Sequence, residues 1–412
     1  MTRPLRILVA TPLPASVTGG IEEYAHSVIE TLRAGGAEVT VLTTRYGKLP
    51  APTPGAPPGR ALEAKELLGR PVCIHPTAYL RIFRFVQRAD VVHIHMPFPF
   101  VEAVVAGLAK LMGKPVVVTY HMDAVVESAD GSLPKPLHRL AEFLYRALSA
   151  VPTVDLADRV CTNTRAYALQ SPVLRDRMER LLVVHQGIDS KKFAELSTDT
   201  AQEVRRQLLG EQHRRLVSFV GRLVPYKGLD VLIEAVRSLD RPDTLFVIGG
   251  RGPEEVRIRR AVADHHLSNV RLLGFVPDQQ LMNLFCASDL VVSPSVSSLE
   301  STPITLLYAR AAGTPVIGTD VGGTGECIPD DGLSGLVVPA GDVPALTSAI
   351  RRLLEAPPTR IREVAPRFWS DVAGEYRDLM GELRDKRRST ATAWPAPGAG
   401  GYSGPSNTFG SK

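Results

Sequence analysis

Short apolar runs alternate with segments of helical periodicity twice along the chain, and this alternation constrains the fold more than any other feature. In the first half the runs are RILVA, EVTVLTT, VVHIHM, PVVVTYH, RVCTNT and LLVVHQ. A second series begins near Leu216 with LVSFVG, TLFVIGG, VRLLGF, LVVSPS, TPVIGT and GLVVP. Apolar strands separated by helix-length segments are typical of parallel sheets with helices on both faces. The sequence therefore predicts an α/β protein with two Rossmann-like, doubly wound domains.

These two series divide the 412 residues into four predicted parts. Residues 1–190 and 191–365 form the two domains, joined near residues 187 to 210, and each is long enough to enclose a core. Residues 366–388 are expected to form C-terminal helices that return to the N-terminal domain. Residues 389–412 are rich in Ala, Gly, Pro and Ser. We expect this tail to be disordered because it buries too little apolar surface.

Charge and cysteine content exclude several classes of protein. The formal net charge is only +5, and Lys and Arg are scattered, so nucleic acid is not an expected partner. Cys73, Cys161, Cys286 and Cys327 lie far apart, without the spacing of a zinc site or a disulfide framework. No metal site is therefore predicted, and the cysteines are expected to be reduced thiols of the core.

The start of the chain, MTRPLRILVATPLPAS, has a basic residue and an apolar run. The run is short, contains prolines and leads directly into a helical pattern, so we interpret it as a first strand rather than a signal peptide. No stretch approaches the ~18 continuous apolar residues of a membrane-spanning helix. A cytoplasmic protein is expected.

In open α/β sheets, ligands bind beyond the carboxyl ends of the strands, so polar residues that follow strands are candidates for a site. Gly19 and Gly20 follow the first strand, where backbone amides can approach a ligand. His121 ends the strand PVVVTYH, and a neutral His there can donate to a ligand hydroxyl; the alternative is a strand-end His satisfied by backbone. His93 and His95 alternate on one face of VVHIHM. With no carboxylate or third His nearby in the sequence, we interpret them as hydrogen-bonded strand histidines rather than metal ligands.

In the second half, Arg222 and Lys227 occupy the loop of FVGRLVPYKGLDVLIEA between a strand and a helix. Arg can bind two oxygens at once and Lys supplies a mobile point charge, so the pair suits a diphosphate. The alternative is a solvated loop with two cations.

The stretch SPSVSSLESTPITLLYARAAGTPVIGTDVGG contains the remaining candidates. Thr302 is a predicted N-cap and Pro303 a predicted first helical residue, which would leave the amides of Ile304 and Thr305 free to bind phosphate. Glu300 precedes this helix and is positioned to accept hydrogen bonds from ligand hydroxyls.

Taken in order, these motifs resemble those of the retaining glycosyltransferases of family 4, which have the GT-B fold of two Rossmann-like domains facing each other across a cleft. The resemblance is carried by TGGIEEYAHSV, VTYHMDAV, SPVLRDRMERLLVVHQGIDSKKF, GRLVPYKGLDVLIEA, LMNLFCASDLVVSPS and LESTPITLLYARAAGTPVIGTDVGGTGE. It implies that Gly20 lies against the donor phosphates and that His121 contacts the transferred sugar. It also implies that Arg222 and Lys227 hold the diphosphate, while Glu300 binds sugar hydroxyls.

Tyr308 is the one clear departure from the family pattern, because the family has there a second carboxylate that holds the ribose of the nucleotide. Tyr308 shares helical spacing with Ile304, Leu307 and Ala311, which also fits a position in the core. The sequence is compatible with two positions for Tyr308, in contact with ribose or packed in the core.

The resemblance implies a UDP- or GDP-linked donor and transfer with retention, in which the departing phosphate helps to take the acceptor's proton. No Asp-x-Asp pair occurs in the sequence, so we expect metal-independent transfer without a cofactor. The expected acceptor is an envelope glycolipid or polysaccharide precursor, or a small natural product. Two alternatives remain, a GT-B nucleotide-sugar epimerase and a degenerate, non-catalytic sugar-binding subunit. The segment KPLHRLAEFLYRALSAV is either a packed surface helix or a peripheral contact with a membrane.

Overall fold

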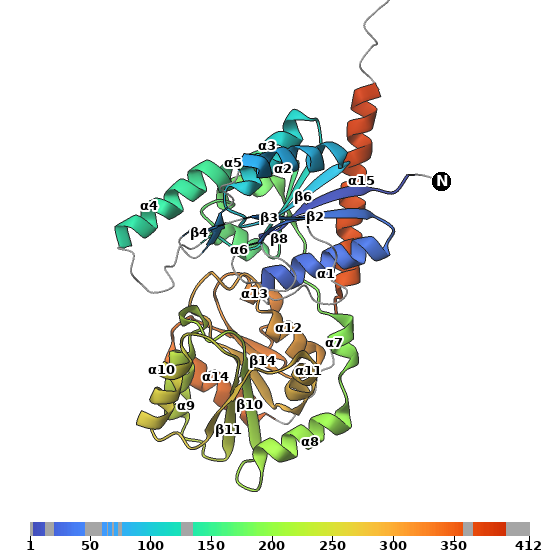
Figure 1. Ribbon diagram of the computed structural model, residues 1–412. Helices are drawn as coiled ribbons and strands as arrows, with labels where there is room; N and C mark the ends of the chain where they lie inside the picture. Colours follow the sequence, from blue (N-terminus) through green and yellow to red (C-terminus); the bar gives the residue numbers. More distant parts are fainter. Residues whose placement is uncertain are drawn as a thin grey trace, which may run out of the picture.

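The computed structural model describes residues 3–12, 20–45, 60–63, 65–67, 70–72, 76–124, 135–356 and 366–392. It contains two separate parallel sheets, one above the other in Figure 1, each covered by helices. Every strand predicted from the apolar runs is present. The architecture is therefore the GT-B arrangement of two Rossmann-like domains.

The first sheet has seven strands in the order β3-β2-β1-β6-β7-β8-β9, and all neighbouring pairs are parallel. Chain order reverses between β1 and β6, which makes this the switch point of the sheet. A separate two-stranded antiparallel sheet joins β4 to β5. The strands are β1 (Arg6–Ala10), β2 (Glu38–Arg45), β3 (Arg60–Glu63), β4 (Lys65–Leu67), β5 (Arg70–Val72), β6 (Val91–Met96), β7 (Val116–Tyr120), β8 (Arg159–Thr162) and β9 (Leu181–Val183).

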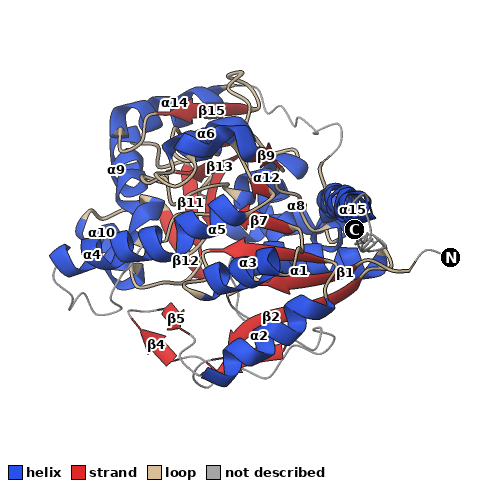
Figure 2. Cartoon of the chain, turned by 90° about the horizontal axis from the view of Figure 1, so that it is seen from above, coloured by secondary structure: helices blue, strands red, loops and turns tan. Residues whose placement is uncertain are grey.

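Two apolar layers enclose the first sheet, because its strands are buried on both faces. One layer includes residues of α2 (Pro76–Arg88), α3 (Val101–Leu111), α5 (Val151–Leu156) and α6 (Arg165–Gln170). The other is formed with α1 (Gly20–Ala34) and the long α15 (Trp369–Thr392). Helix α15, seen end on in Figure 2, packs beside α1.

The second sheet has six parallel strands in the order β12-β11-β10-β13-β14-β15, with its switch point between β10 and β13. The strands are β10 (Arg215–Val220), β11 (Thr244–Gly249), β12 (Val270–Gly274), β13 (Leu290–Ser293), β14 (Val316–Thr319) and β15 (Gly335–Val338). On one face lie α8 (Thr198–Leu209), α11 (Asp278–Ala287) and α12 (Ile304–Ala311). On the other lie α9 (Leu229–Leu239), α10 (Glu255–Asp264) and α14 (Val343–Glu355).

The remaining described elements connect these layers. They are α4 (Lys135–Tyr145), the π-helical turn η1 (Arg146–Ala150), the 3-10 segments η2 (Arg175–Arg180) and η3 (Pro225–Lys227), and the short helices α7 (Ser190–Ala194) and α13 (Thr324–Cys327). Within the described ranges, no helix has both the length and the apolar character needed to cross a bilayer.

The chain passes between the domains twice, and the two passages are hydrogen-bonded to each other. The amide of Ile188 donates to Arg367 O (2.8 Å), and the amide of Trp369 donates to Ile188 O (3.2 Å). A Cβ added at Gly187 would lie 2.6 Å from the carbonyl carbon of Phe368, so only glycine permits this approach. After the second passage, α15 packs on the first domain.

Helix α15 also corrects the predicted start of the tail. It runs past Arg388 to Thr392, so residues 389–392 are helical rather than disordered. The physical reason is that Gly and Pro, which disfavour a helix interior, begin only at Pro395. Residues 393–412 lie outside the described ranges, as do Cys73 and Gly19.

Candidate functional site

The switch point of the second sheet brings together a cation and a carboxylate that lie far apart in the sequence. Lys227, in η3 after β10, donates from Nζ to Oε2 of Glu300, which follows β13. Ser295 Oγ donates to the same oxygen (2.9 Å). Glu300 is only 6% exposed, so these two donors compensate for the removal of its charge from water.

The two loops meet because the backbone allows a very close approach at Gly228. This residue has a φ of 64°, in the left-handed region that favours glycine. A Cβ there would lie 2.0 Å from the carbonyl oxygen of Pro294. Next to it, the amide of Val296 donates to Tyr226 O (2.8 Å). The glycine thus fixes the loop that carries Lys227 against the loop that carries Glu300.

Arg222 lies at the start of the same β10–α9 loop and is exposed. Its Nη2 lies 3.2 Å from the hydroxyl of Tyr226 and donates to it. The guanidinium therefore remains open to solvent on most sides and can bind an anion.

The amino end of α12 differs from the prediction. The N-cap is Pro303 rather than Thr302, because a ψ of 79° at Pro303 delays the helix until Ile304. The amide of Ile304 donates to Thr302 O (2.9 Å) in a tight turn, so it is not free to bind phosphate. The amide of Thr305 has no hydrogen-bond partner among the described residues.

Tyr308 lies inside the apolar layer of α8, α11 and α12 and is 1% exposed. Its hydroxyl accepts a hydrogen bond from the amide of Asp189 (3.0 Å) and donates to Oε1 of Glu23 on α1 (3.2 Å). Burial raises the pKa of Tyr308, so the phenol keeps its proton. Lys192 Nζ lies 5.5 Å from the ring centroid and donates to Glu23 as well (2.8 Å). Tyr308 thus links the second domain to the first.

His121 follows β7 in the first domain and is 3% exposed. Its Nε2 lies 2.9 Å from Nδ1 of His95, so its partner is a second histidine and not the backbone. The edge of its ring meets Tyr24, with centroids 4.7 Å apart and an interplanar angle of 76°. Burial lowers the pKa of His121 to about 3, which makes the imidazole neutral at neutral pH.

His93 and His95 are fully buried on β6. His93 Nε2 lies 2.7 Å from Thr119 Oγ1, so each of the two strand histidines has one hydrogen bond. The sequence does not reveal that His121 is the third histidine of this group. No set of three or more metal-ligating side chains with the geometry of a metal site occurs in the described ranges.

Gly20 is the first residue of α1, at the carboxyl edge of the first sheet, and is exposed. No atom of the described residues lies within 4 Å of a Cβ added there, so a residue with a side chain would also fit at this position.

Two contacts at the facing edges of the domains were not predicted. The carboxylate of Glu326, at α13, accepts hydrogen bonds from the amides of Arg165 (2.8 Å) and Ala166 at the start of α6. The side chain of Gln170 both donates to Gly322 O (3.3 Å) and accepts from Gly322 N (3.2 Å). The sequence marks Glu326 only as a carboxylate after a glycine-rich loop, and the partner on the other domain has no local signal. These contacts hold the two carboxyl edges together.

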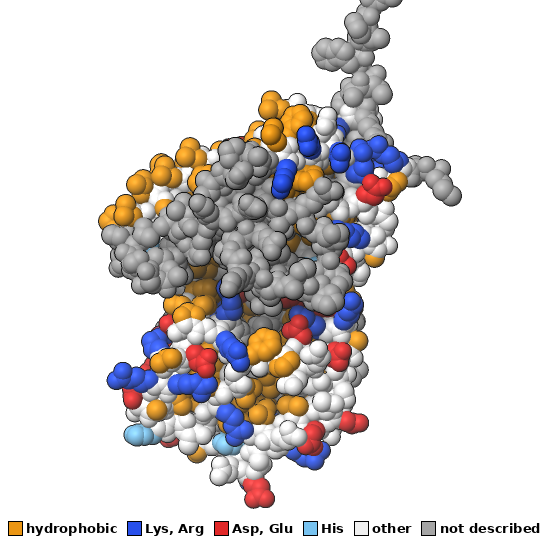
Figure 3. Space-filling view, viewed as in Figure 1, with side chains coloured by type: hydrophobic (Ala, Val, Ile, Leu, Met, Phe, Trp, Pro, Cys, Tyr) orange, Lys and Arg blue, Asp and Glu red, His pale blue; other side chains and the backbone are white. Residues whose placement is uncertain are grey.

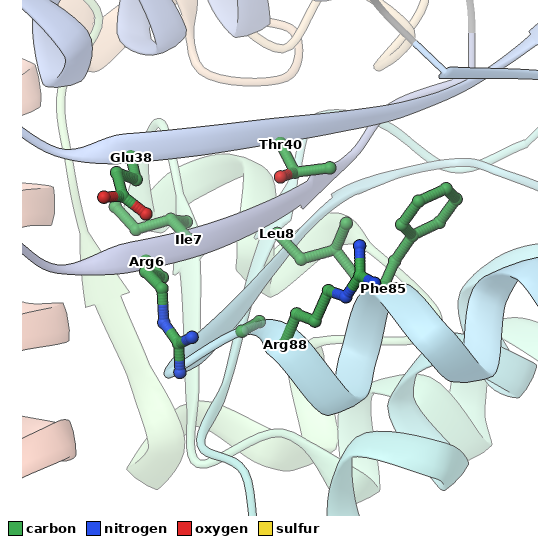
Figure 4. A pocket seen from close by; sticks show the side chains of 8 residues that line it. Arg6, Ile7, Leu8, Glu38, Thr40, Phe85 and Arg88 are labelled. Carbon is green, nitrogen blue, oxygen red and sulfur yellow. The ribbon is translucent and has the colours of Figure 1, made fainter.

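A cavity of about 330 Å³, shown in Figure 4, lies at the amino ends of β1 and β2. It is at the opposite end of the strands from the residues described above. We therefore do not assign it to the candidate site. Its lining residues are Arg6, Ile7, Leu8, Glu38, Thr40, Phe85, Arg88 and Ala89.

Two family models match the chain, "Glycosyltransferase Family 4" over residues 18–192 and "Glycosyl transferases group 1" over residues 200–365. A D-rhamnosyltransferase of Pseudomonas aeruginosa, WbpZ, is 29% identical over 368 residues, covering 89% of each chain. A D-inositol 3-phosphate glycosyltransferase of Mycolicibacterium smegmatis is 31% identical over 366 residues, covering 83% of this chain and 80% of the relative. The solved structure of Anabaena HepE in complex with UDP is 18% identical, with a TM-score of 0.64, and covers 94% of this chain and 100% of HepE.

Proposed function

Because the chain belongs to the family 4 glycosyltransferases, we propose that it transfers a sugar from a UDP- or GDP-linked donor with retention of configuration and without a metal ion. The observation that carries this proposal is the contact of Lys227 and Ser295 with the buried Glu300 at the switch point of the second sheet. Arg222 lies in the same loop as Lys227. HepE, which has a similar fold, binds UDP, and this supports a nucleotide-linked donor.

Arg222 and Lys227 would neutralise the diphosphate as it leaves. A lysine ammonium has three donors. One is used on Glu300, so two remain for phosphate oxygens. The unpartnered amide of Thr305, in the first turn of α12, would add a donor and the positive end of the helix dipole. Such preorganised charges and dipoles stabilise developing negative charge without a metal ion.

Glu300 and His121 would bind the transferred sugar from opposite domains. Among the described residues, the hydrogen bonds to the Glu300 carboxylate are both to Oε2, so Oε1 can accept from a sugar hydroxyl. His121, which is neutral, can donate to a sugar hydroxyl without adding positive charge next to the developing oxocarbenium ion. The acceptor's proton would pass to the departing phosphate.

Tyr308 would not bind ribose in this proposal. Its hydroxyl is already engaged by Asp189 and Glu23, and its ring is in the core. The ribose would be held by other groups, and Tyr308 would instead stabilise the approach of the two domains.

The acceptor would be an envelope glycolipid or polysaccharide precursor, or a small natural product. One relative is a D-inositol 3-phosphate glycosyltransferase, and this supports the small-molecule alternative. A lipid-linked acceptor also requires a surface that rests on the membrane.

We place such a surface on α4 and η1. Apolar side chains recur there at helical spacing and are exposed to solvent, and Figure 3 shows them as a row along the edge of the first domain where α4 lies. Arg139 and Arg146 are exposed among them, which favours an anionic lipid surface. We assign this face to peripheral membrane contact. Its exposed apolar residues are Leu137 (49%), Leu140 (51%), Phe143 (54%), Leu144 (42%) and Leu148 (60%).

Sedimentation with phosphatidylcholine vesicles, with and without phosphatidylglycerol, tests this contact. We expect binding only to the anionic vesicles, lost in a Leu140→Asp, Phe143→Asp variant. Val256→Asp is the matched control, because Val256 is 78% exposed on α10 of the other domain. Equal loss in the control, or no vesicle binding by the wild type, would contradict the assignment.

The reaction itself is tested by incubating the protein with UDP-, GDP- and dTDP-sugars and measuring nucleotide release, followed by NMR of the anomeric centre of the product. Release with retained configuration is the expected result. A reversible change in the donor sugar without release would indicate an epimerase. Binding of the donor without any turnover would indicate a degenerate sugar-binding subunit.

A further inference from the structure

The three histidines His93, His95 and His121 form a buried group between β6, β7 and the two helices α1 and α15. The ring centroids of His93 and His95 are 4.3 Å apart, and those of His95 and His121 are 5.2 Å apart. The interplanar angle of the second pair is only 12°. With Nδ1 of His95 2.9 Å from Nε2 of His121, nearly parallel ring planes direct an N–H of one imidazole toward the lone pair of the other.

A neutral imidazole carries one N–H and one acceptor nitrogen, so the bond between His95 and His121 has one donor and one acceptor. Burial lowers the pKa of both rings, which excludes a doubly protonated partner near neutral pH. The direction of this one bond therefore fixes the tautomer of each ring.

The other nitrogen of His95 decides the direction. Its Nε2 is buried and has no hydrogen-bond partner among the residues that the structure describes. If His121 donated, His95 would carry its proton on this nitrogen, as a buried N–H without an acceptor. A donor left unsatisfied in this way loses its hydrogen bonds to water without replacement, which is unfavourable. Among backbone groups, orphaned buried N–H groups are rarer than under-satisfied acceptors. His95 therefore donates from Nδ1, and His121 accepts at Nε2.

We propose that His95 is a positioning residue that holds His121 in the tautomer with its proton on Nδ1, so that this N–H is the group offered to a sugar hydroxyl of the donor. The role of the N–H rests on the proposed function of His121. Among the described residues, Nδ1 of His121 has no hydrogen-bond partner that would compete for this donor.

The surrounding network fixes the orientation of both rings. The ring of Tyr24 packs against that of His121, and its centroid lies 6.0 Å from the ring centroid of His95. Both contacts have an edge-on geometry. The Tyr24 hydroxyl is hydrogen-bonded to that of Tyr376 on α15 (3.0 Å). Tyr376 in turn is 2.7 Å from Thr119 Oγ1, which contacts His93. Rotation of the His95 ring would break its bond to His121 and disturb this packing.

The test is ¹⁵N NMR of the side-chain histidine nitrogens in the wild type, His95→Leu and His95→Gln proteins, without any substrate. In the wild type we expect a protonated Nδ1 and an unprotonated Nε2 on His121. In His95→Leu the preference is expected to be lost, whereas the amide N–H of glutamine can replace the donor and keep it. His93→Leu is the matched control, because it removes a buried imidazole from the same strand without touching the His95–His121 bond.

Kinetics provide the second measurement. We expect kcat for transfer to fall by roughly 10- to 100-fold in His95→Leu, as for partners that orient a functional histidine, with little change in KM, and to be largely restored in His95→Gln. A wild-type His121 protonated on Nε2 would overturn the proposal, and so would an unchanged tautomer in His95→Leu. If His95→Leu does not fold, the wild-type and His95→Gln spectra decide. Because the tautomer is measured without substrate, a protein without transferase activity would defeat the proposed function and not this inference.

Discussion

Replacement of Tyr308 separates a core position from a ribose-binding position more sharply than any other change. In the structure Tyr308 is 1% exposed, and its hydroxyl accepts a hydrogen bond from the amide of Asp189 and donates one to the carboxylate of Glu23. Tyr308→Phe removes only this hydroxyl. Tyr308→Glu restores the carboxylate that the family has at this position, and places it in the apolar layer beside Glu23.

The two variants should differ in magnitude. Tyr308→Phe leaves the partly buried amide of Asp189 without its acceptor, which costs about 1–3 kcal/mol. At about 2–4 °C per kcal/mol for domains of this size, the expected fall in Tm is ~2–12 °C. Tyr308→Glu adds the loss of a buried aromatic ring, about 3–5 kcal/mol by analogy with large-to-small changes, and repulsion from Glu23. Lys192 cannot easily compensate, because it already bridges Glu23 and Asp278.

Thermal melts with and without UDP or GDP measure the Tm of each variant. We expect the Tm to follow the order wild type, Tyr308→Phe, Tyr308→Glu, with no recovery of the last by nucleotide. Leu307→Glu is the matched control, since it introduces the same side chain one position away at a partly exposed site, and its Tm should fall less than that of Tyr308→Glu. A Tyr308→Glu protein as stable as the wild type, and stabilised more by nucleotide, would show that this side chain reaches the ribose and would refute the reasoning.

Three further predictions concern the site and the histidines. Glu300→Gln should lower transfer more than about 100-fold while circular dichroism stays unchanged, and turnover within about threefold of the wild type would remove Glu300 from the site. Arg222→Ala and Lys227→Ala should each weaken UDP or GDP binding by calorimetry, whereas EDTA should not; loss of turnover in EDTA and its recovery with magnesium would contradict the metal-independent mechanism. Because the pKa values of His93 and His121 are lowered to about 3, the unfolded state alone binds these protons as the pH falls from about 6.5 toward 3. Burial lowers the pKa of His95 in the same direction. The unfolding free energy should therefore decrease with acidification, with a slope approaching ~4.1 kcal/mol per pH unit for the three groups, and His93→Gln should remove about a third of this slope in urea titrations near pH 7 and pH 5.5.

The fold could be predicted because local sequence patterns determine its strands and helices. Strands such as RILVA and VVHIHM are buried on both faces, so they appear as continuous apolar runs. The candidate residues after strands could be found for the same reason, since the carboxyl ends of parallel strands meet at one edge of a sheet. The positions of His121, Arg222, Lys227 and Glu300 beyond strand ends follow from sequence position alone.

The tertiary structure decided which groups contact these residues. Helical spacing is compatible with Tyr308 in a core or at a ligand. The packing of α12 against α11 and the hydrogen bond of Tyr308 to α1 show that it lies in the core. The sequence predicts Pro303 as the first helical residue, but with a ψ of 79° it precedes the helix, which starts at Ile304. The amide of Ile304 is then hydrogen-bonded to Thr302 O.

The bond between His95 and His121 and the cap of α6 by Glu326 were not predictable from local sequence. His95 lies on β6 and His121 follows the neighbouring β7. Glu326 and the amides that donate to it lie on different domains. A local sequence pattern reports whether a side chain is buried, because burial on a strand or helix repeats with a fixed period. It does not report which distant group shares the buried space, since that depends on how whole sheets and domains pack against one another.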